Sequence, residues 1–267
     1  MAVPLRLVEI PADNHPLVTR LCRHVLLSDA EIARLRSGFE RRLTIKNKRD
    51  VLLEGYKSHS LHVVVSGFAV RYKLLADGKR QVLSIILPGD IIGMPCAFFQ
   101  PSIYSVTTLC EVTVDVVSLA RFLELCREVP SLAVGMLWYS VHELATYGDH
   151  IIDVGRRSPL ERIAHFLLEM HSRLRLAGCA AESSFEMPLS QEIIGDLLGL
   201  SAPHVNRMLH ELKSERLISI FRRQVTFKDV EGLWLLAQFE PLPSPAIATI
   251  PSAGNGQMDR PRSSRLA

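Results

Sequence analysis

Residues 189–218 constrain the fold of this chain more than any other segment, because their pattern predicts two short helices joined by a tight turn. Apolar residues at helical spacing mark the buried side of the first helix, and these are Ile193, Ile194, Leu197 and Leu198. The small Gly195 suits a close approach of two helices, and Gly199 suits a helix end because glycine tolerates positive φ. The segment therefore predicts a helix-turn-helix.

The second helix of this unit has a polar outer face. Ser201 is a good N-cap, and Pro203 falls in the first turn, where its missing N–H costs little. The predicted buried stripe consists of Val205, Met208, Leu209 and Leu212. The side chains left facing outward are Pro203, His204, Asn206, Arg207, His210 and Lys213. Such side chains meet base edges in the major groove, so the segment predicts sequence-specific binding to double-stranded DNA.

Arg207 is the strongest candidate for base readout, since a guanidinium can donate two hydrogen bonds to guanine O6 and N7. Ser190 and Ser201, at the starts of the two helices, join the predicted contact set. Two short β-type runs follow around Arg222 and Arg223, and they predict the wing of a winged helix whose basic turn meets phosphates. The alternative is an ordinary helical hairpin in an α-helical core, with a solvated outer face.

Composition sets outer limits on the class of protein. The chain has 267 residues, 48% of them hydrophobic and 22% charged, which predicts a folded protein with two domains, each with its own core. The net charge is only +3, so any DNA-binding surface must be local. No signal segment and no apolar stretch of roughly 20 residues is visible, so we expect a cytoplasmic protein that does not partner a membrane.

The five cysteines lie far apart, with no CxxC pair and no histidine at ligand spacing. They are Cys22, Cys96, Cys110, Cys126 and Cys179. This pattern argues against a structural zinc or iron–sulfur site, and we expect no metal and no cofactor. Most of the thiols are expected to be buried and inert, and redox sensing by one of them is the alternative.

The first part of the chain changes from helical to β pattern. Residues 15–40 are expected to be helical, with a capping box formed by Ser28 and Glu31. From about residue 43 to 117 short apolar runs alternate with turns, as at Asp77 and Gly78. In residues 112–116, valines alternate with polar residues, which is typical of a half-buried strand. The pattern predicts an antiparallel β-barrel or jelly roll.

A helical pattern returns between residues 119 and 154. An apolar heptad seam is formed by Val134, Leu137, Val141, Leu144, Gly148 and Ile151. Such a seam can pair with its own copy, so it predicts a homodimer interface; the alternative is that it packs on the β domain.

Ser158, Pro159 and Glu161 then start a new helix. The predicted fold class is α+β: an N-terminal helical segment (1–42), an antiparallel β-roll sensor domain (43–120), a dimerisation helix (121–156), a winged helix-turn-helix domain (157–238) and a disordered tail (239–267).

This order resembles the Crp-Fnr family of bacterial transcription regulators, across roughly residues 17–235. The residues that carry the resemblance are Gly67-Phe68, Asp77-Gly78, the run 87–93 (LPGDIIG) and the helix-turn-helix. The resemblance implies a homodimer on a palindromic promoter site that contacts RNA polymerase, with a signal received in the β-roll. It favours activation over repression.

Two departures from the family pattern affect the expected sites. Cyclic-AMP-binding members have a glutamate directly after the glycine that matches Gly93, and this chain has Met94 there. They have an arginine ten residues after that glutamate, and this chain has Tyr104 there, whereas the next residue, Ser105, matches the family. Because a phenol replaces the guanidinium that would pair with the cyclic phosphate, we expect cyclic AMP to bind weakly or not at all. In the second helix of the helix-turn-helix, Pro203 stands where members commonly carry a glutamate that contacts a base, so the DNA half-site that the family usually binds is not expected to apply unchanged. Arg207 matches the family's base-contacting arginine.

Other readings of the chain remain open. An N-terminal cysteine cluster like that of the oxygen-sensing members is missing, and a haem held by His59 or His62 is the alternative to a strand-surface role for those residues. The signal could be an unknown small-molecule effector, a thiol modification or the protein's own concentration. A module that binds a ligand or protein through its helix-turn-helix competes with DNA binding. An enzyme is not expected, since phosphate loops, metal-ligand spacing and nucleophile-base patterns are missing.

Overall fold

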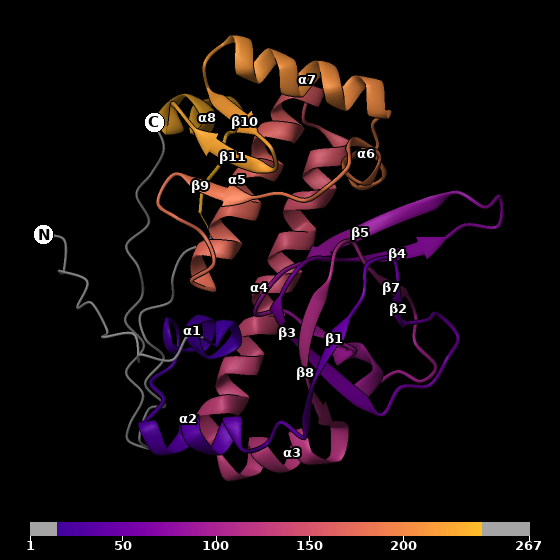
Figure 1. Cartoon of the computed structure of the whole chain (residues 1–267), viewed down its shortest axis with the longest axis vertical. Helices are drawn as coiled ribbons and strands as arrows, with labels where there is room; N and C mark the ends of the chain where they lie inside the picture. Colours follow the sequence, from indigo (N-terminus) through magenta and orange to yellow (C-terminus); the bar gives the residue numbers. More distant parts are fainter. Residues whose placement is uncertain (1–14, 242–267) are drawn as a thin grey trace, which may run out of the picture.

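The computed structural model describes residues 15–241, and it places a β-roll below a smaller helical domain, with one long helix running between them (Figure 1). Two short helices, α1 (Pro16–Cys22) and α2 (Asp29–Arg36), precede the roll. The predicted capping box starts α2: the backbone N–H groups of Ser28 and Glu31 donate to each other's side chains, at 2.8 and 3.3 Å. The first 14 residues of the predicted N-terminal segment lie outside the described residues.

The β-roll consists of two antiparallel four-stranded sheets, in the orders β1-β8-β3-β6 and β2-β7-β4-β5. Its strands are β1 (Arg41–Ile45), β2 (Asp50–Leu52), β3 (Ser60–Ser66), β4 (Ala69–Leu74), β5 (Arg80–Ile86), β6 (Ile91–Ile92), β7 (Ser105–Thr108) and β8 (Val112–Ser118). A single 3₁₀ turn, η1 (Met94–Ala97), follows β6. The predicted antiparallel roll is confirmed, with its first strand starting two residues earlier than expected.

Strand β8 shows how the sequence pattern builds the roll. Val112, Val114 and Val116 alternate as predicted and are all buried in the interior between the sheets. Asp115, which the alternation places on the polar face, is also buried, because Arg42 and His15 cover it. Arg42 donates to both of its carboxylate oxygens at 2.7 and 2.8 Å, so the outward carboxylate is paired rather than hydrated.

The helical region after the roll is divided in two. The prediction of one dimerisation helix over residues 121–156 is wrong. Instead, α3 (Leu119–Glu128) is followed by the non-helical Val129, and α4 (Pro130–Gly155) starts immediately after it. Val129 has φ −126° and ψ 83°, outside the helical region. The cause is local, because the ring of a proline disfavours the α conformation in the residue before it.

The C-terminal domain contains α5 (Pro159–Leu176), α6 (Gln191–Leu198), α7 (Ala202–Ser214), α8 (Val230–Ala237) and a small sheet of order β10-β11-β9. The strands are β9 (Ser184–Glu186), β10 (Ile218–Phe221) and β11 (Gln224–Phe227). The predicted capping box at Ser158 and Glu161 begins α5. Strand β9 was not predicted, since three residues are too short for a periodic signal.

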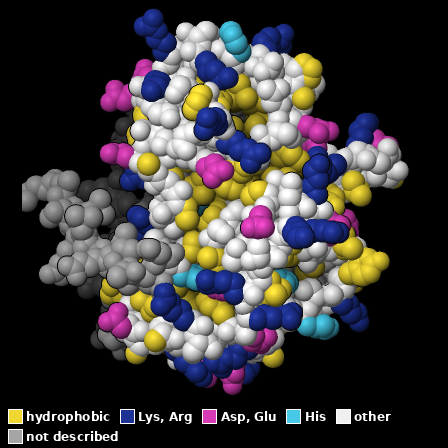
Figure 2. Space-filling model, in the orientation of Figure 1, with side chains coloured by type: hydrophobic (Ala, Val, Ile, Leu, Met, Phe, Trp, Pro, Cys, Tyr) yellow, Lys and Arg dark blue, Asp and Glu magenta, His cyan; other side chains and the backbone are white. Residues whose placement is uncertain are grey.

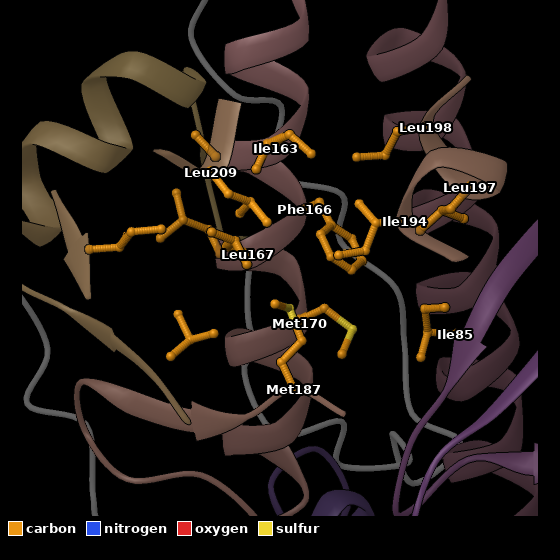
Figure 3. Close-up of a cluster of buried hydrophobic side chains, with 14 of the residues drawn as sticks. Ile85, Ile163, Phe166, Leu167, Met170, Met187, Ile194, Leu197, Leu198 and Leu209 are labelled. Atoms are coloured by element: carbon orange, nitrogen blue, oxygen red, sulfur yellow. The ribbon is translucent and has the colours of Figure 1, made fainter. Parts of the chain in front are cut away.

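The interior of the β-roll has a hydrophobic cluster of its own, and a second cluster, that of the C-terminal domain, extends onto the outer face of the roll, which the sequence did not predict. Figure 3 shows Ile85 of β5 facing Phe166 and Met170 of α5, with Ile194 and Leu197 of α6 beside them. The outer face of β5 is apolar, and α5 carries buried residues on several sides. The two units therefore bury apolar surface against each other instead of exposing it.

The predicted disordered tail begins too early. Phe239 is half-buried and packs against this same cluster, and its backbone N–H donates to the Trp234 carbonyl at 3.1 Å. The rest of the predicted tail, residues 242–267, lies outside the described residues. Among the described helices, none is long and apolar enough to cross a membrane.

The substitution Gly195→Ala is expected to destabilise the helix-turn-helix. A Cβ at this buried position would collide with the backbone carbonyl oxygen of Leu200, which closes the turn and cannot move independently. We expect the free energy of unfolding to fall by about 1–3 kcal/mol, measured by chemical denaturation. Gly155→Ala is the control, because a Cβ there meets open space; an equal loss in both variants would contradict the prediction.

Candidate DNA-binding and effector sites

The predicted helix-turn-helix is formed by α6 and α7, which pack together across a turn at Gly199. Gly199 has φ 67° and ψ 37°, the left-handed conformation that the sequence predicted for this helix end. Ser190 caps α6, accepting a hydrogen bond from the Ile193 backbone at 3.2 Å. Ser201 precedes α7, and its hydroxyl makes no cap hydrogen bond, so it is free to meet another group.

The outer face of α7 has the side chains that the sequence assigned to DNA contact. Seven of the predicted residues of the helix-turn-helix are exposed, namely Ser190, Ser201, Pro203, Asn206, Arg207, His210 and Lys213, and His204 is partly exposed. Figure 2 shows Lys, Arg and His side chains gathered over the end of the molecule where α7 lies. The structure therefore brings these residues onto one open surface; their contact with bases stays a prediction.

Sequence reasoning missed Gln191, the first residue of α6. Its side-chain amide donates to Oδ1 of Asn206 at 2.9 Å, across the two helices. This bond engages the Asn206 carbonyl oxygen, so the amide N–H groups of this exposed side chain remain as its donors. The only available signal was the position of Gln191 directly after the cap Ser190.

The predicted wing is present as the hairpin of β10 and β11, which pair with Phe221 opposite Gln224. Arg222 and Arg223 form its turn and are both exposed, with Arg222 in the left-handed region at φ 49°. Phe221, which was not predicted as a site residue, is 73% exposed, and the Arg222 guanidinium lies 5.4 Å from its ring centre. The wing thus offers two cations and an aromatic ring at its tip.

A polar contact ties the β-roll to the reading head. Arg80 at the start of β5 donates to the Asp196 carboxylate of α6 from Nε at 2.9 Å and from Nη2 at 2.5 Å. The side chain of Gln81 donates to the Asp196 carbonyl at 2.9 Å. Since Asp196 lies on the first helix of the helix-turn-helix, these bonds attach β5 to the helix that packs against α7. Residues so far apart in sequence gave no pattern to predict this.

The four predicted effector-pocket residues do not form one surface. Tyr104 and Ser105 are buried next to the roll interior, and the Ser105 hydroxyl accepts from the Glu54 backbone at 3.0 Å. Met94 packs instead against a different cluster, which includes residues of α1 and α4. Gly93 has φ 93°, and a Cβ on it would lie 3.1 Å from the Ser60 carbonyl oxygen. Glycine is therefore needed here for backbone reasons alone.

Arg71 is the buried residue of this region that sequence reasoning missed. It lies on β4 with its guanidinium 4.6 Å from the Tyr104 ring centre, and it is only 3% exposed. Its Nη1 donates to Glu143 Oε1 at 2.7 Å and to the hydroxyl of Tyr147, both on α4. We call these four residues the Arg71 clasp. The only sequence signal was an arginine within the apolar start of a strand.

The charge state of the clasp follows from its surroundings. Burial, the largest single influence, lowers the pKa of Arg71, but the Glu143 carboxylate and the hydroxyls of Tyr104, Tyr147 and Tyr139 together outweigh it and hold that pKa above its usual value. Burial raises the pKa of Tyr104 to about 12, so the phenol stays neutral. A guanidinium is therefore present inside this part of the roll, supplied by β4 and already paired with the long helix.

The remaining candidates are scattered. His59 is exposed before β3, and His62 is half-buried on β3, with its pKa lowered by burial and by Arg41. The expectation of mostly buried thiols is wrong: Cys22 and Cys96 are buried, Cys110 and Cys126 are half-buried, and Cys179 is exposed. Within residues 15–241, no three His, Cys, Asp or Glu side chains are grouped as metal ligands.

The heptad seam of α4 is open to solvent in the single chain. Leu137, Val141, Leu144 and Ile151 are 67%, 58%, 70% and 68% exposed, Gly148 is exposed and Val134 is half-buried. The alternative, in which this stripe packs on the β domain, is therefore wrong. The opposite side of α4 does that, through residues such as Met136 and Tyr139.

Comparison with known proteins agrees with this architecture. The sequence model of the cyclic nucleotide-binding domain matches residues 42–129, and that of the Crp-like helix-turn-helix domain matches residues 161–236. The chain is 33% identical over 197 residues to the nitrogen fixation regulation protein FixK of Bradyrhizobium diazoefficiens, covering 74% of this chain and 82% of that protein. It is also 33% identical to the transcriptional activatory protein AadR of Rhodopseudomonas palustris, covering 65% and 71%.

Among solved structures, FixK2 from Bradyrhizobium japonicum superposes with a TM-score of 0.64 at 26% identity, covering 73% of this chain and 96% of that chain. Together with the two domain matches and the 33% identity to FixK over 74% of this chain, this shows that the chain belongs to the Crp-Fnr family of bacterial transcription regulators.

Proposed function

We propose that this regulator binds a palindromic promoter site as a homodimer and activates transcription through contact with RNA polymerase. The observation that carries the DNA-binding part is the open face of α7 beside a wing with two exposed arginines. The exposed seam of α4 supports the dimer, since two copies bring two reading helices to half-sites about one helical turn apart. The relative named as a transcriptional activatory protein supports activation.

We also propose that cyclic AMP does not control this protein. Tyr104 occupies the expected phosphate-binding position with a neutral, buried phenol, and Arg71 is committed to Glu143. A cyclic phosphate entering here would have to displace the Glu143 carboxylate from Arg71, at a cost in buried charge pairing. Titration calorimetry with cyclic AMP is expected to show no saturable binding in the micromolar range. Saturable binding that tightens DNA binding would contradict the proposal.

The function is tested by selecting bound sequences from a random duplex library with purified, ligand-free protein. A palindromic consensus with half-sites about one helical turn apart is the expected result. A salt titration on the winning site should show strongly salt-dependent affinity, since phosphate contacts release counterions. Salt-independent binding would favour the competing reading, in which the helix-turn-helix mediates protein contacts.

Arg207→Ala is expected to cost about 1–3 kcal/mol of binding free energy at the selected site and to relax preference at one base pair per half-site. The reason is the loss of a bidentate contact to guanine from an exposed guanidinium on α7. The matched control is Arg222→Ala on the wing, which is expected to weaken binding to the selected and the scrambled duplex by the same factor. Fluorescence anisotropy measures both affinities. An unchanged ratio of the two affinities in Arg207→Ala would remove Arg207 from base readout.

A further inference from the structure

Two neighbouring hollows lie where the end of α1, α4, α5 and the end of the described chain meet. The inner one, which we call the junction pocket, holds about 650 Å³ of atom-free space and has His24 and Trp138 in its wall. The outer one, which we call the α5-α8 groove, is open to solvent and holds about 1200 Å³. One ligand can extend from one hollow into the other, because they share the wall residues Ser172, Leu176, Phe239 and Pro241.

His24 lines the junction pocket with unsatisfied ring nitrogens. The residue is 2% exposed, and neither Nδ1 nor Nε2 has a hydrogen-bond partner. Its ring stacks on Trp138, with 3.4 Å between ring centres. Burial, Arg20 and Arg23 lower the pKa of His24 to about 4, so the ring is neutral and has one N–H available to donate. Buried polar groups normally have partners, so the unused nitrogens point to a bound molecule.

The charges that act on the His24 ring are both positive. Arg20 and Arg23 each lower its pKa, and no carboxylate raises it. Arg20 pairs with Asp90 at 2.5 Å, whereas Arg23 has no ion-pair partner among residues 15–241, and its Nε donates to the Leu176 carbonyl at 3.1 Å. A cation would therefore be repelled at this ring, and an anion that accepts its N–H hydrogen bond would be attracted.

The carboxylates in the wall of the junction pocket do not cancel this field. Glu169 is paired with Arg173 at 3.0 Å, so its charge is already compensated. Asp149 is partly exposed and Glu240 is exposed, so water and salt screen both of them. The uncompensated charge nearest the buried ring is that of Arg23.

A second unpaired guanidinium lies beside the first, in the wall of the α5-α8 groove. Burial and the charge of Arg175 lower the pKa of Arg23, so the two cations are close enough to repel each other. Arg175 donates to the backbone carbonyl of Glu182 at 3.4 Å, and the Glu182 side chain is exposed. Neither guanidinium has an ion-pair partner within the described residues. Apolar side chains form much of the remaining wall: Leu168, Leu176, Phe227, Val230, Trp234 and Phe239.

We infer that the two hollows together bind one small organic carboxylate with an apolar body. The carboxylate would lie at the boundary between them, facing Arg23 and accepting the N–H of His24, and the apolar body would lie along the α5-α8 groove. An anion there would also relieve the repulsion between Arg23 and Arg175, which no carboxylate of the described residues offsets. Binding itself requires neither DNA nor a dimer.

The test uses three probes of nearly equal shape and different charge: octanoate, octanamide and octylamine. The full-length chain contains two tryptophans, one in the wall of each hollow, Trp138 in the junction pocket and Trp234 in the groove. Octanoate is expected to change the fluorescence of both single-tryptophan variants, Trp138→Phe and Trp234→Phe, saturably, and calorimetry on the parent protein is expected to show saturation as well. Octanamide is expected to bind about tenfold more weakly, and octylamine is expected to show no saturation at the same concentrations.

Variants locate the binding. Arg23→Met, at an exposed position, is expected to weaken octanoate binding by about tenfold, since it removes one charge-assisted bond, and Arg23→Lys, which keeps the charge, should weaken it less. His24→Phe, which keeps the ring stack and removes both nitrogens, should also weaken it. The control is Arg127→Met, an exposed arginine on α3 outside both hollows, which should leave the affinity unchanged.

Absence of saturable octanoate binding, octylamine binding as tight as that of octanoate, or equal octanoate affinity in Arg23→Met and the parent would each overturn the inference. Octanoate binding only in a chain that lacks residues 242–267 would assign the groove to that segment instead, and affinity that falls as protein concentration rises would assign it to a second copy. None of these outcomes bears on sequence-specific DNA binding, which the library selection tests separately.

Discussion

Leu144→Glu is expected to convert the protein to a monomer and to weaken binding to the palindromic site by about 100-fold or more. Leu144 is 70% exposed at the middle of the α4 seam, where two copies would bury it against its counterpart. A glutamate there would place two like charges together in an apolar interface, which opposes association. Light scattering coupled to size-exclusion chromatography measures the mass, and anisotropy on full and half sites measures DNA binding.

The control for this experiment is Leu235→Glu on α8, a leucine that is 81% exposed and lies outside the seam. It should leave both the mass and the affinity of the parent unchanged. A Leu144→Glu protein that keeps the mass of a dimer would show that the seam is not the interface. A parent protein that is monomeric at micromolar concentration and still binds the full palindrome tightly would contradict the proposed dimer as well.

Arg71→Met is expected to lower the free energy of unfolding by about 3 kcal/mol, because it leaves the Glu143 carboxylate without its partner in a largely buried place. Methionine keeps the length of the side chain and removes only the charge and the donors. A double-mutant cycle with Glu143→Gln should show that the two changes are coupled, measured by chemical denaturation. We also expect weaker DNA binding by the ligand-free protein, since the clasp joins the β-roll to α4.

Lys73→Met is the matched control, two residues further along β4. Lys73 pairs with Glu54 at 2.9 Å, but both side chains are about two-fifths exposed, at 44% and 40%. Exposed pairs contribute little, so we expect a change within about 1 kcal/mol. Equal losses in Arg71→Met and Lys73→Met, or additive effects of Arg71→Met and Glu143→Gln, would show that the clasp does not act as a coupled unit.

The reading head and the helix starts were predictable because their signals are local. Gly199 needs a left-handed backbone within its own turn, and Ser158 with Glu161 forms a capping box over three residues. The alternation in β8 likewise indicates which valines face inward. In each case the physical cause acts between residues that are close in sequence, and a single sequence displays it.

The break at Val129 was also local, yet the helical pattern on both sides outweighed Pro130 in the prediction. The junction between the domains was different in kind. The shared cluster, the bond from Arg80 to Asp196 and the clasp of Arg71 on Glu143 join residues separated by 70 or more positions. No periodicity indicates such pairs, because any arginine in a strand has many carboxylates available to it.

The sequence by itself therefore determined the elements of this protein, their order, the helix-turn-helix with its wing and the family. Only the tertiary structure decided that one hydrophobic cluster spans the two domains and that Arg71 occupies the region where an effector was expected. The reason is physical. Propensity, capping and alternation act along the chain, whereas burial and charge pairing depend on which distant surfaces the packed fold brings together.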